Sequence, residues 1–131
     1  MSNGTLRVEL VAADRLVWSG EATMVMARTV EGDIGVLVGH APVLSVMHGG
    51  ALRITEASGN VVRAAVSDGF VSVAADRVSI LADRVELADE IDASAARSDL
   101  DEAAAAAAGS EDPAVAAKLR FAQGRVDALT K

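Results

Sequence analysis

Over the first 91 residues, apolar and polar side chains alternate with a period of two, in short runs separated by turn residues. The clearest alternating runs are LRVELV (6–11), TMVMART (23–29), ALRITEA (51–57) and FVSVA (70–74). Residues typical of hairpin turns lie between the runs, at Asp14-Arg15, Ser58-Gly59-Asn60, Ser67-Asp68-Gly69 and Asp76-Arg77. Since no helical stretch separates these strand-sized runs, the pattern predicts an antiparallel β-sandwich or barrel of about nine or ten strands. The last strand is expected in RVELADEI (84–91).

After Ile91 the pattern becomes helical. Residues 92–109 are rich in alanine, which has the highest helix propensity, with Asp92 placed as N-cap and Gly109 as terminator. A second helix start follows in the Asp112-Pro113 pair, an N-cap and a proline at the first helical position.

Beyond that second start, apolar residues recur at alternating spacings of four and three, which gives one apolar stripe: Val115, Leu119, Ala122, Val126 and Leu129. Two helices joined by the short GSED linker must run antiparallel. We therefore expect two units, an all-β domain over residues 1–91 and a C-terminal antiparallel α-helical hairpin over residues 92–131.

The expected hairpin is weakly packed and asymmetric in charge. Leu100 is the only large apolar side chain of its first helix. Residues 92–112 carry a net charge of −5, whereas residues 113–131 carry +3. The basic side chains of the second helix either form an ordinary solvated face or form a strip that meets an acidic partner when the hairpin moves.

The composition of the 131-residue chain argues against several functions. Its net charge of −7 and its 2% aromatic content disfavour nucleic-acid binding. It has no cysteine, no phosphate-loop motif, and no metal-ligand spacing around His40 and His48, so no cofactor or metal is expected. The uncharged stretch 34–52 is broken by glycines and Pro42, which indicates buried strands and turns and no direct insertion into lipid. The chain is expected to bind proteins and to perform no chemistry itself.

Four segments, in order and at matching spacing, carry a family resemblance: EGDIGVLVGHAPVLS (31–45), GGALRI (49–54), SDGFVSV (67–73) and VSILAD (78–83). This set closely resembles the ε subunit of bacterial F-type ATP synthases. The resemblance implies a ten-stranded β-sandwich that binds the γ subunit and the membrane-embedded c ring, followed by a helical hairpin. It also implies a non-catalytic central-stalk subunit on the cytoplasmic face of the membrane, attached only through the complex. Such a subunit couples c-ring rotation in a proton-translocating synthase to the catalytic hexamer.

The resemblance assigns roles to individual residues. It implies c-ring contacts at Glu31, Asp33 and Gly35, and γ-subunit contacts at His40, Ala41, Pro42, Gly69 and Phe70. It implies that the extended hairpin inhibits ATP hydrolysis through contacts of Lys118, Arg120 and Arg125 with the catalytic α/β subunits. The glycines at 32, 35 and 39 are expected to permit tight turns that display Glu31 and Asp33 outward.

Some members of this family bind ATP through a motif like I-D-x-x-R-A at the start of the first helix. Here Ile91, Asp92 and Arg97 are the candidate nucleotide-binding residues, but Ala95 stands at the arginine position. The missing guanidinium disfavours nucleotide binding. Two other readings of the whole chain remain: a free-standing β-sandwich adaptor whose helical tail binds a different partner, and a small β-barrel enzyme.

Overall fold

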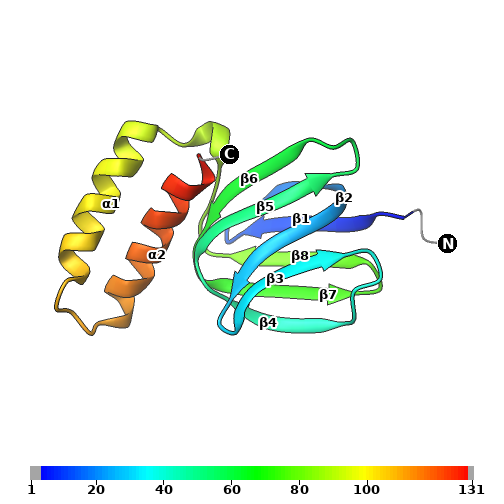
Figure 1. Cartoon of the computed structure of the whole chain (residues 1–131), viewed down its shortest axis with the longest axis horizontal. Coiled ribbons are helices and arrows are strands. Elements are labelled where there is room, and N and C mark those ends of the chain that lie inside the picture. The colour runs from blue at the N-terminus through cyan, green and yellow to red at the C-terminus, as the bar shows by residue number, and fades with distance from the viewer. Residues whose placement is uncertain (1–3, 130–131) are drawn as a thin grey trace.

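A computed structural model describes residues 4–129. Nine strands come first: β1 (Leu6–Ala12), β2 (Arg15–Thr29), β3 (Gly32–Leu37), β4 (Val43–Met47), β5 (Gly50–Glu56), β6 (Val61–Val66), β7 (Gly69–Ala74), β8 (Arg77–Ala82) and β9 (Val85–Leu87). A 3₁₀ turn, η1 (Ala88–Glu90), leads into α1 (Ala93–Ala107) and α2 (Pro113–Ala128). The predicted order, a β-sandwich followed by a helical hairpin, is confirmed (Figure 1).

The strands form two layers joined by the long strand β2. Along the sheet the order is β1-β8-β7-β4-β2-β5-β6-β9, with β3 added on β2. The first half of β2 pairs with β1 and the second half with β3 and β5, so one strand belongs to both layers. All pairings are antiparallel except β1 with β8, which is parallel.

The sandwich core is aliphatic, as a chain with 2% aromatic residues requires. Alternate residues of the strands fill it, which is the physical reason for the period-two pattern. In β1, for example, Leu6, Val8 and Leu10 are fully buried while Arg7 and Glu9 are exposed. No residue of α1 or α2 belongs to this core cluster, and Ala96, Phe121 and Ala128 of the hairpin form a separate cluster with Ala65 and Ile91.

Four local predictions about the strands were wrong. Ser67-Asp68 is no hairpin turn, because β6 pairs with β5 and β9 whereas β7 pairs with β4 and β8, so the chain crosses between layers there. The turns placed at Asp14-Arg15 and at Asp76-Arg77 each lie one residue earlier, since β2 begins at Arg15 and β8 begins at Arg77. The last predicted strand, 84–91, is only three residues long before η1 begins.

The uncharged stretch 34–52 was predicted to be buried and is largely not. Leu37 and Leu44 are 56% and 75% exposed, and Val38 and Val46 are also exposed. The reason is that β3 pairs with β2 alone, and no other element of the described chain covers the outer face of β4. Among the residues described, no helix is both long and apolar enough to cross a membrane.

The helix boundaries follow the capping signals in the sequence. The Asp92 carboxylate accepts a hydrogen bond from the Ala95 N–H at 3.1 Å, and Asp112 accepts one from the Ala114 N–H at 2.9 Å. Gly109 ends α1 with a φ of 75°, the left-handed conformation that favours glycine.

The hairpin is docked on the sandwich through α2, with α1 outside it (Figure 1). The predicted stripe on α2 is only partly right: Ala122 is buried, but Val115, Leu119, Val126 and Leu129 are half-buried. The other buried positions, Phe121, Gly124 and Ala128, were not predicted. A Cβ on Gly124 would lie 2.5 Å from the Gly50 carbonyl carbon, so α2 approaches β5 backbone to backbone.

Candidate functional site

The β2–β3 turn, which we call the rim loop (residues 30–33), presents acidic side chains on a braced backbone. The buried Thr29 hydroxyl donates to the Gly32 carbonyl at 2.8 Å and accepts from the Glu31 N–H at 3.1 Å. Gly32 has a φ of 122°, which a larger residue would rarely adopt. Glu31 and Asp33 are both exposed, as predicted. The rim loop therefore presents two exposed carboxylates on a braced backbone.

Asp33 already has a partner within the chain. Its Oδ1 lies 3.3 Å from the Arg28 Nε, and both side chains are more than half exposed. Gly35, predicted as a turn residue, lies instead within β3, opposite Met26. A Cβ at Gly35 would be 3.0 Å from the Met26 Sδ, so this glycine makes room for a neighbouring side chain. The turn role expected for Gly35 was wrong, while Gly32 and Gly39 do have positive φ.

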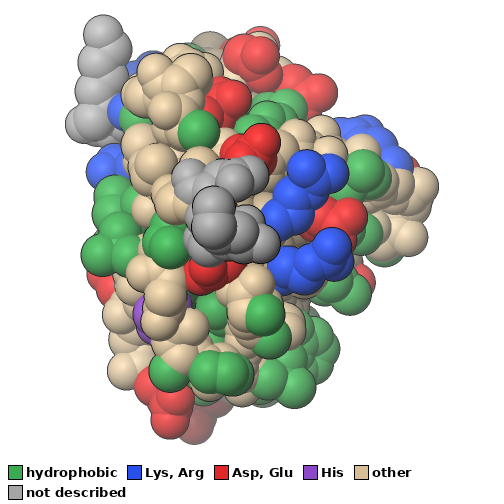
Figure 2. All heavy atoms as spheres, turned by 90° about the vertical axis from the view of Figure 1, so that its right-hand side faces the viewer, with side chains coloured by type: hydrophobic (Ala, Val, Ile, Leu, Met, Phe, Trp, Pro, Cys, Tyr) green, Lys and Arg blue, Asp and Glu red, His purple; other side chains and the backbone are tan. Residues whose placement is uncertain are grey.

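The β3–β4 loop, residues 38–42, is fixed mainly by its backbone. Gly39 has a φ of 85°, and its N–H donates to the Asp76 carboxylate at 2.7 Å. The His40 Nδ1 lies 2.7 Å from the Ala41 carbonyl oxygen, so the imidazole is tied to its own loop. Ala41 and Pro42 are exposed. Figure 2 faces this end of the molecule, away from the hairpin, and shows hydrophobic side chains on its surface.

The predicted γ-contact residues do not form one patch. Val43 at the start of β4 pairs with Val73, whereas Met47 at its end pairs with Gly69. The 40–42 loop and the Gly69-Phe70 pair therefore lie at opposite ends of β4. The rim loop and the 40–42 loop are likewise separated by the six residues of β3, about 20 Å of extended chain.

Phe70 belongs instead to an apolar row that crosses five strands. Cross-strand partners follow one another in the order Val46, Phe70, Leu81, Val11 and Leu16. Four of them (Val46, Phe70, Leu81 and Leu16) are 47%, 53%, 50% and 54% exposed. We call these five residues the apolar row. Of the apolar row, only Phe70 was predicted from the sequence. The other members could have been recognised because these strands carry apolar residues on both faces, so one apolar face must be exposed.

Arg120 of α2 forms an ion pair with Asp68, in the short connection between β6 and β7. Its guanidinium donates to both carboxylate oxygens of Asp68, at 2.8 and 3.4 Å, and Asp68 also accepts the Gly49 N–H at 2.7 Å. Burial raises the pKa of Asp68, but the hydrogen bond from Arg120, the Gly49 N–H and the charges of Arg120 and His48 outweigh it, so the pKa lies below its ordinary value. The stabilisation that the Asp68–Arg120 ion pair gives to the docked hairpin is therefore fully present above the pH range in which aspartate ordinarily titrates. It is lost as the pH falls through the lowered pKa of Asp68.

Arg125 joins both helices to the sandwich. It is only 12% exposed; its Nη1 lies 2.6 Å from Asp99 of α1, and its Nε lies 3.0 Å from Glu86 of β9. The second contact is close but not aligned for a hydrogen bond. Nearby, the Arg84 guanidinium stacks 4.3 Å from the centre of the Phe121 ring.

Most of the predicted basic strip is thus engaged in ion pairs within the chain when the hairpin is docked. Lys118 is exposed, but Arg120 and Arg125 are engaged within the chain. Lys131, which contributed to the charge of this segment, lies outside the described residues.

The three candidate nucleotide-binding residues are not brought together around a cavity. Ile91 is buried in the hairpin cluster, the Asp92 carboxylate caps α1, and Arg97 is exposed. The two described cavities beside α2 are lined by other residues.

Comparisons with known proteins agree on one family. Residues 5–88 match the family described as "ATP synthase, Delta/Epsilon chain, beta-sandwich domain". An ATP synthase epsilon chain from Streptomyces avermitilis is 49% identical over 120 residues, covering 92% of this chain and 97% of that protein. Another, from Thermobifida fusca, is 49% identical over 127 residues, covering 94% of this chain and 90% of that protein. Among solved structures, a chain of the Euglena gracilis mitochondrial ATP synthase (OSCP/F1/c-ring) has a TM-score of 0.78 at 25% identity, covering 98% of this chain and 81% of that chain.

Proposed function

The chain belongs to the ε-subunit family of F-type ATP synthases, and on that premise we propose that it is a regulatory rotor subunit of the central stalk. Its sandwich couples c-ring rotation to the catalytic hexamer, and its hairpin restrains ATP hydrolysis. The subunit sits at the cytoplasmic face of the membrane, held there by the complex. The observation that carries this proposal is the docked hairpin, whose polar contacts use the same arginines that an acidic partner would bind.

The sandwich meets the γ subunit through the apolar row. Apolar side chains that lie in register across neighbouring strands form a continuous exposed patch, which is typical of a protein-binding surface. Gly69 supports this surface, because a Cβ there would collide with the Leu81 backbone carbonyl. Gly69 and Phe70 thus retain the γ-contact role, and the row extends it to Val46 and Leu81. His40, Ala41 and Pro42 would form a second contact, at the far end of the same layer.

Replacing Phe70 with aspartate should weaken association with a γ-type subunit at least tenfold. The substitution replaces the aromatic side chain of the apolar row with a charge, and aromatic anchors that become buried in an interface contribute most to binding. Co-purification of the variant with γ measures the effect, and Ala57→Asp, in the exposed β5–β6 turn, is the matched control. Equal recovery of γ with the Phe70 variant and with the control would refute this assignment of the surface.

The rim loop meets basic loops of the c ring, with Glu31 and Asp33 as the charged contacts and Gly35 close behind them on β3. Its carboxylates are exposed and its backbone is braced by Thr29, so a partner cation would not have to order the loop that carries them. Exchanging both carboxylates for lysine should lower proton-driven ATP synthesis severalfold, because each exposed pair contributes only about 0–1 kcal/mol and both are reversed together. Arg28→Ala, which frees Asp33 without reversing its charge, is the control. Unchanged synthesis in the double variant would exclude a c-ring contact here.

Release of the hairpin is an exchange of ion pairs. Docked, Arg120 pairs with Asp68 and Arg125 with Asp99 and Glu86. Extended, α2 would present Lys118, Arg120 and Arg125 together to the catalytic α/β subunits, and an inserted helix would block rotation in the hydrolysis direction. Since a partly exposed pair such as Arg120–Asp68 contributes only about 0–1 kcal/mol, exchanging it for a pair with the partner changes the balance between the two states little.

A further inference from the structure

A surface cleft of about 300 Å³ lies at one end of the apolar row. Three members of the row, Val11, Phe70 and Leu81, form its apolar wall. Two carboxylates border it: Asp68, in the connection between β6 and β7, and Asp83, in the connection between β8 and β9. We call it the Asp83 cleft. It joins an exposed apolar surface to exposed negative charge.

Only one of the two bordering carboxylates is neutralised within the chain. Asp68 accepts hydrogen bonds from Arg120 at 2.8 Å and from the Gly49 N–H at 2.7 Å. Asp83, by contrast, belongs to no ion pair among residues 4–129. Asp14, in the neighbouring β1–β2 turn, is also exposed and forms no ion pair within that range. The cleft therefore retains a net negative charge when the hairpin is docked.

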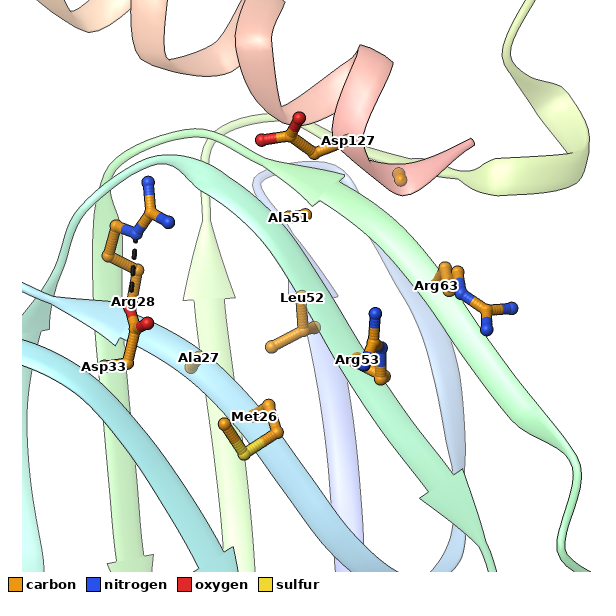
Figure 3. Close-up of a pocket in the computed structure, with 10 residues that line it drawn as sticks. Met26, Ala27, Arg28, Asp33, Ala51, Leu52, Arg53, Arg63 and Asp127 are labelled. Carbon is orange, nitrogen blue, oxygen red and sulfur yellow. Dashed lines mark hydrogen bonds and ion pairs between the residues drawn. The ribbon is translucent and has the colours of Figure 1, made fainter. Parts of the chain in front are cut away.

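The arginines of the described chain do not supply the missing cation. Arg84 follows Asp83 directly, but its guanidinium stacks 4.3 Å from the centre of the Phe121 ring and lies 3.8 Å from Glu86. Arg15, at the start of β2, forms no ion pair with Asp83 either. Three others line a separate cavity in the other layer, beneath the end of α2 (Figure 3): Arg28, Arg53 and Arg63.

We propose that the Asp83 cleft receives a long basic side chain, lysine or arginine, of the γ subunit. This inference rests on the proposed function, in which γ covers the apolar row. Lysine and arginine lay their aliphatic stems on apolar surface while the charged head stays at the edge, near water. The apolar wall of the cleft suits the stem, and the Asp83 carboxylate suits the head.

Two other kinds of occupant fit the cleft less well. A small organic ligand would find little room, because pockets for such ligands range from about 300 to 1,000 Å³ and this cleft is at the lower limit. A metal ion would find too few ligands, since no group of three or more His, Asp or Glu side chains suited to a metal occurs in the described part of the chain.

A basic side chain in this cleft would fix the position of γ on the sandwich. Apolar contacts are not directional, so the apolar row alone does not determine how a partner is placed along it. A charge pair at one end of the row sets that register and disfavours partners that present an acidic group there. Asp83 would thus be a specificity-determining residue of the γ-binding surface.

The affinity of the full chain for the γ subunit, measured at low and at high salt, tests the proposal with Asp83→Asn, which removes the charge and keeps the shape. We expect binding at low salt to weaken roughly five- to tenfold. We also expect the variant to lose less affinity than the unmodified chain when salt is added, because the screened attraction is already gone. Asp89→Asn, exposed on η1 at the edge of the other layer, is the matched control and should bind as the unmodified chain does.

The Phe70→Asp variant separates this inference from the assignment of the surface. If Phe70→Asp weakens binding but Asp83→Asn behaves as Asp89→Asn does, γ covers the apolar row without a basic side chain in the cleft, and the inference is overturned. If neither Phe70→Asp nor Asp83→Asn weakens binding, γ binds elsewhere and the proposed surface fails as well. Thermal unfolding of each variant establishes that the fold is retained.

Discussion

Replacing Gly124 with alanine should release the hairpin from the sandwich. The added Cβ would lie 2.5 Å from the Gly50 carbonyl carbon and 2.7 Å from its Cα and oxygen, distances that backbone atoms cannot accommodate without moving apart. Overpacking of this kind costs about 1–3 kcal/mol. Since about 1.4 kcal/mol is a tenfold change in an equilibrium, the released fraction should rise roughly five- to hundredfold.

The sign of the effect is what makes this substitution informative. In a helix that packs against nothing, replacing glycine with alanine stabilises the helix by about 0.5–1 kcal/mol. If α2 did not pack closely against β5, the alanine variant should therefore be cleaved more slowly by trypsin than the unmodified chain. The measurement is the rate of tryptic cleavage in α2, where docking shields Arg120 and Arg125. Gln123→Ala, at the exposed neighbouring position, is the control and should leave the rate nearly unchanged. Slower cleavage of the Gly124 variant than of the unmodified chain would show that this close approach does not hold the hairpin.

The architecture could be predicted because its signals are local. The alternation of apolar and polar residues indicates a strand with one buried face, and the N-cap residues Asp92 and Asp112 mark where each helix begins. Which strands pair is not local information. The segment Ser67-Asp68-Gly69 has the composition of a turn, yet it crosses between layers because the partners of β6 and β7 come from distant parts of the chain.

The packing face of α2 shows a second limit. A stripe of apolar residues is the usual signal for a buried helix face, and it selected Val115, Leu119, Ala122, Val126 and Leu129. The structure buries Phe121, Ala122, Gly124 and Ala128 and leaves the larger stripe residues half-buried, and Gly124 allows the backbone of α2 to come close to β5. Nothing in the sequence of α2 alone indicates that its partner at the contact is also a glycine.

The rim loop could be predicted from local sequence, whereas the contacts of the basic residues on α2 could not, because their partners are distant in sequence. The exposed carboxylates of the rim loop follow from turn composition and from the family resemblance, and the structure places both on the surface. The partners of Arg120 and Arg125 lie up to 52 residues away in sequence, so their ion pairs could not be foreseen.

Ending the chain after Ile91 should leave a folded sandwich that still joins the synthase. The sandwich core contains no hairpin residue, so its apolar packing survives the deletion. The apolar row and the rim loop, which we assign to the γ subunit and the c ring, also lie outside the deleted segment. What is lost is the helix that carries Lys118, Arg120 and Arg125, and with it the proposed block on rotation in the hydrolysis direction.

The rate of ATP hydrolysis by the complex, compared between the truncated and the intact chain, tests the regulatory role of the hairpin most directly. Circular dichroism of the truncated chain and its co-purification with γ establish that the comparison is between assembled complexes. We expect hydrolysis to rise severalfold on truncation while proton-driven synthesis changes far less. If the truncated complex hydrolyses ATP no faster than the intact one, the hairpin covers the sandwich without regulating the motor.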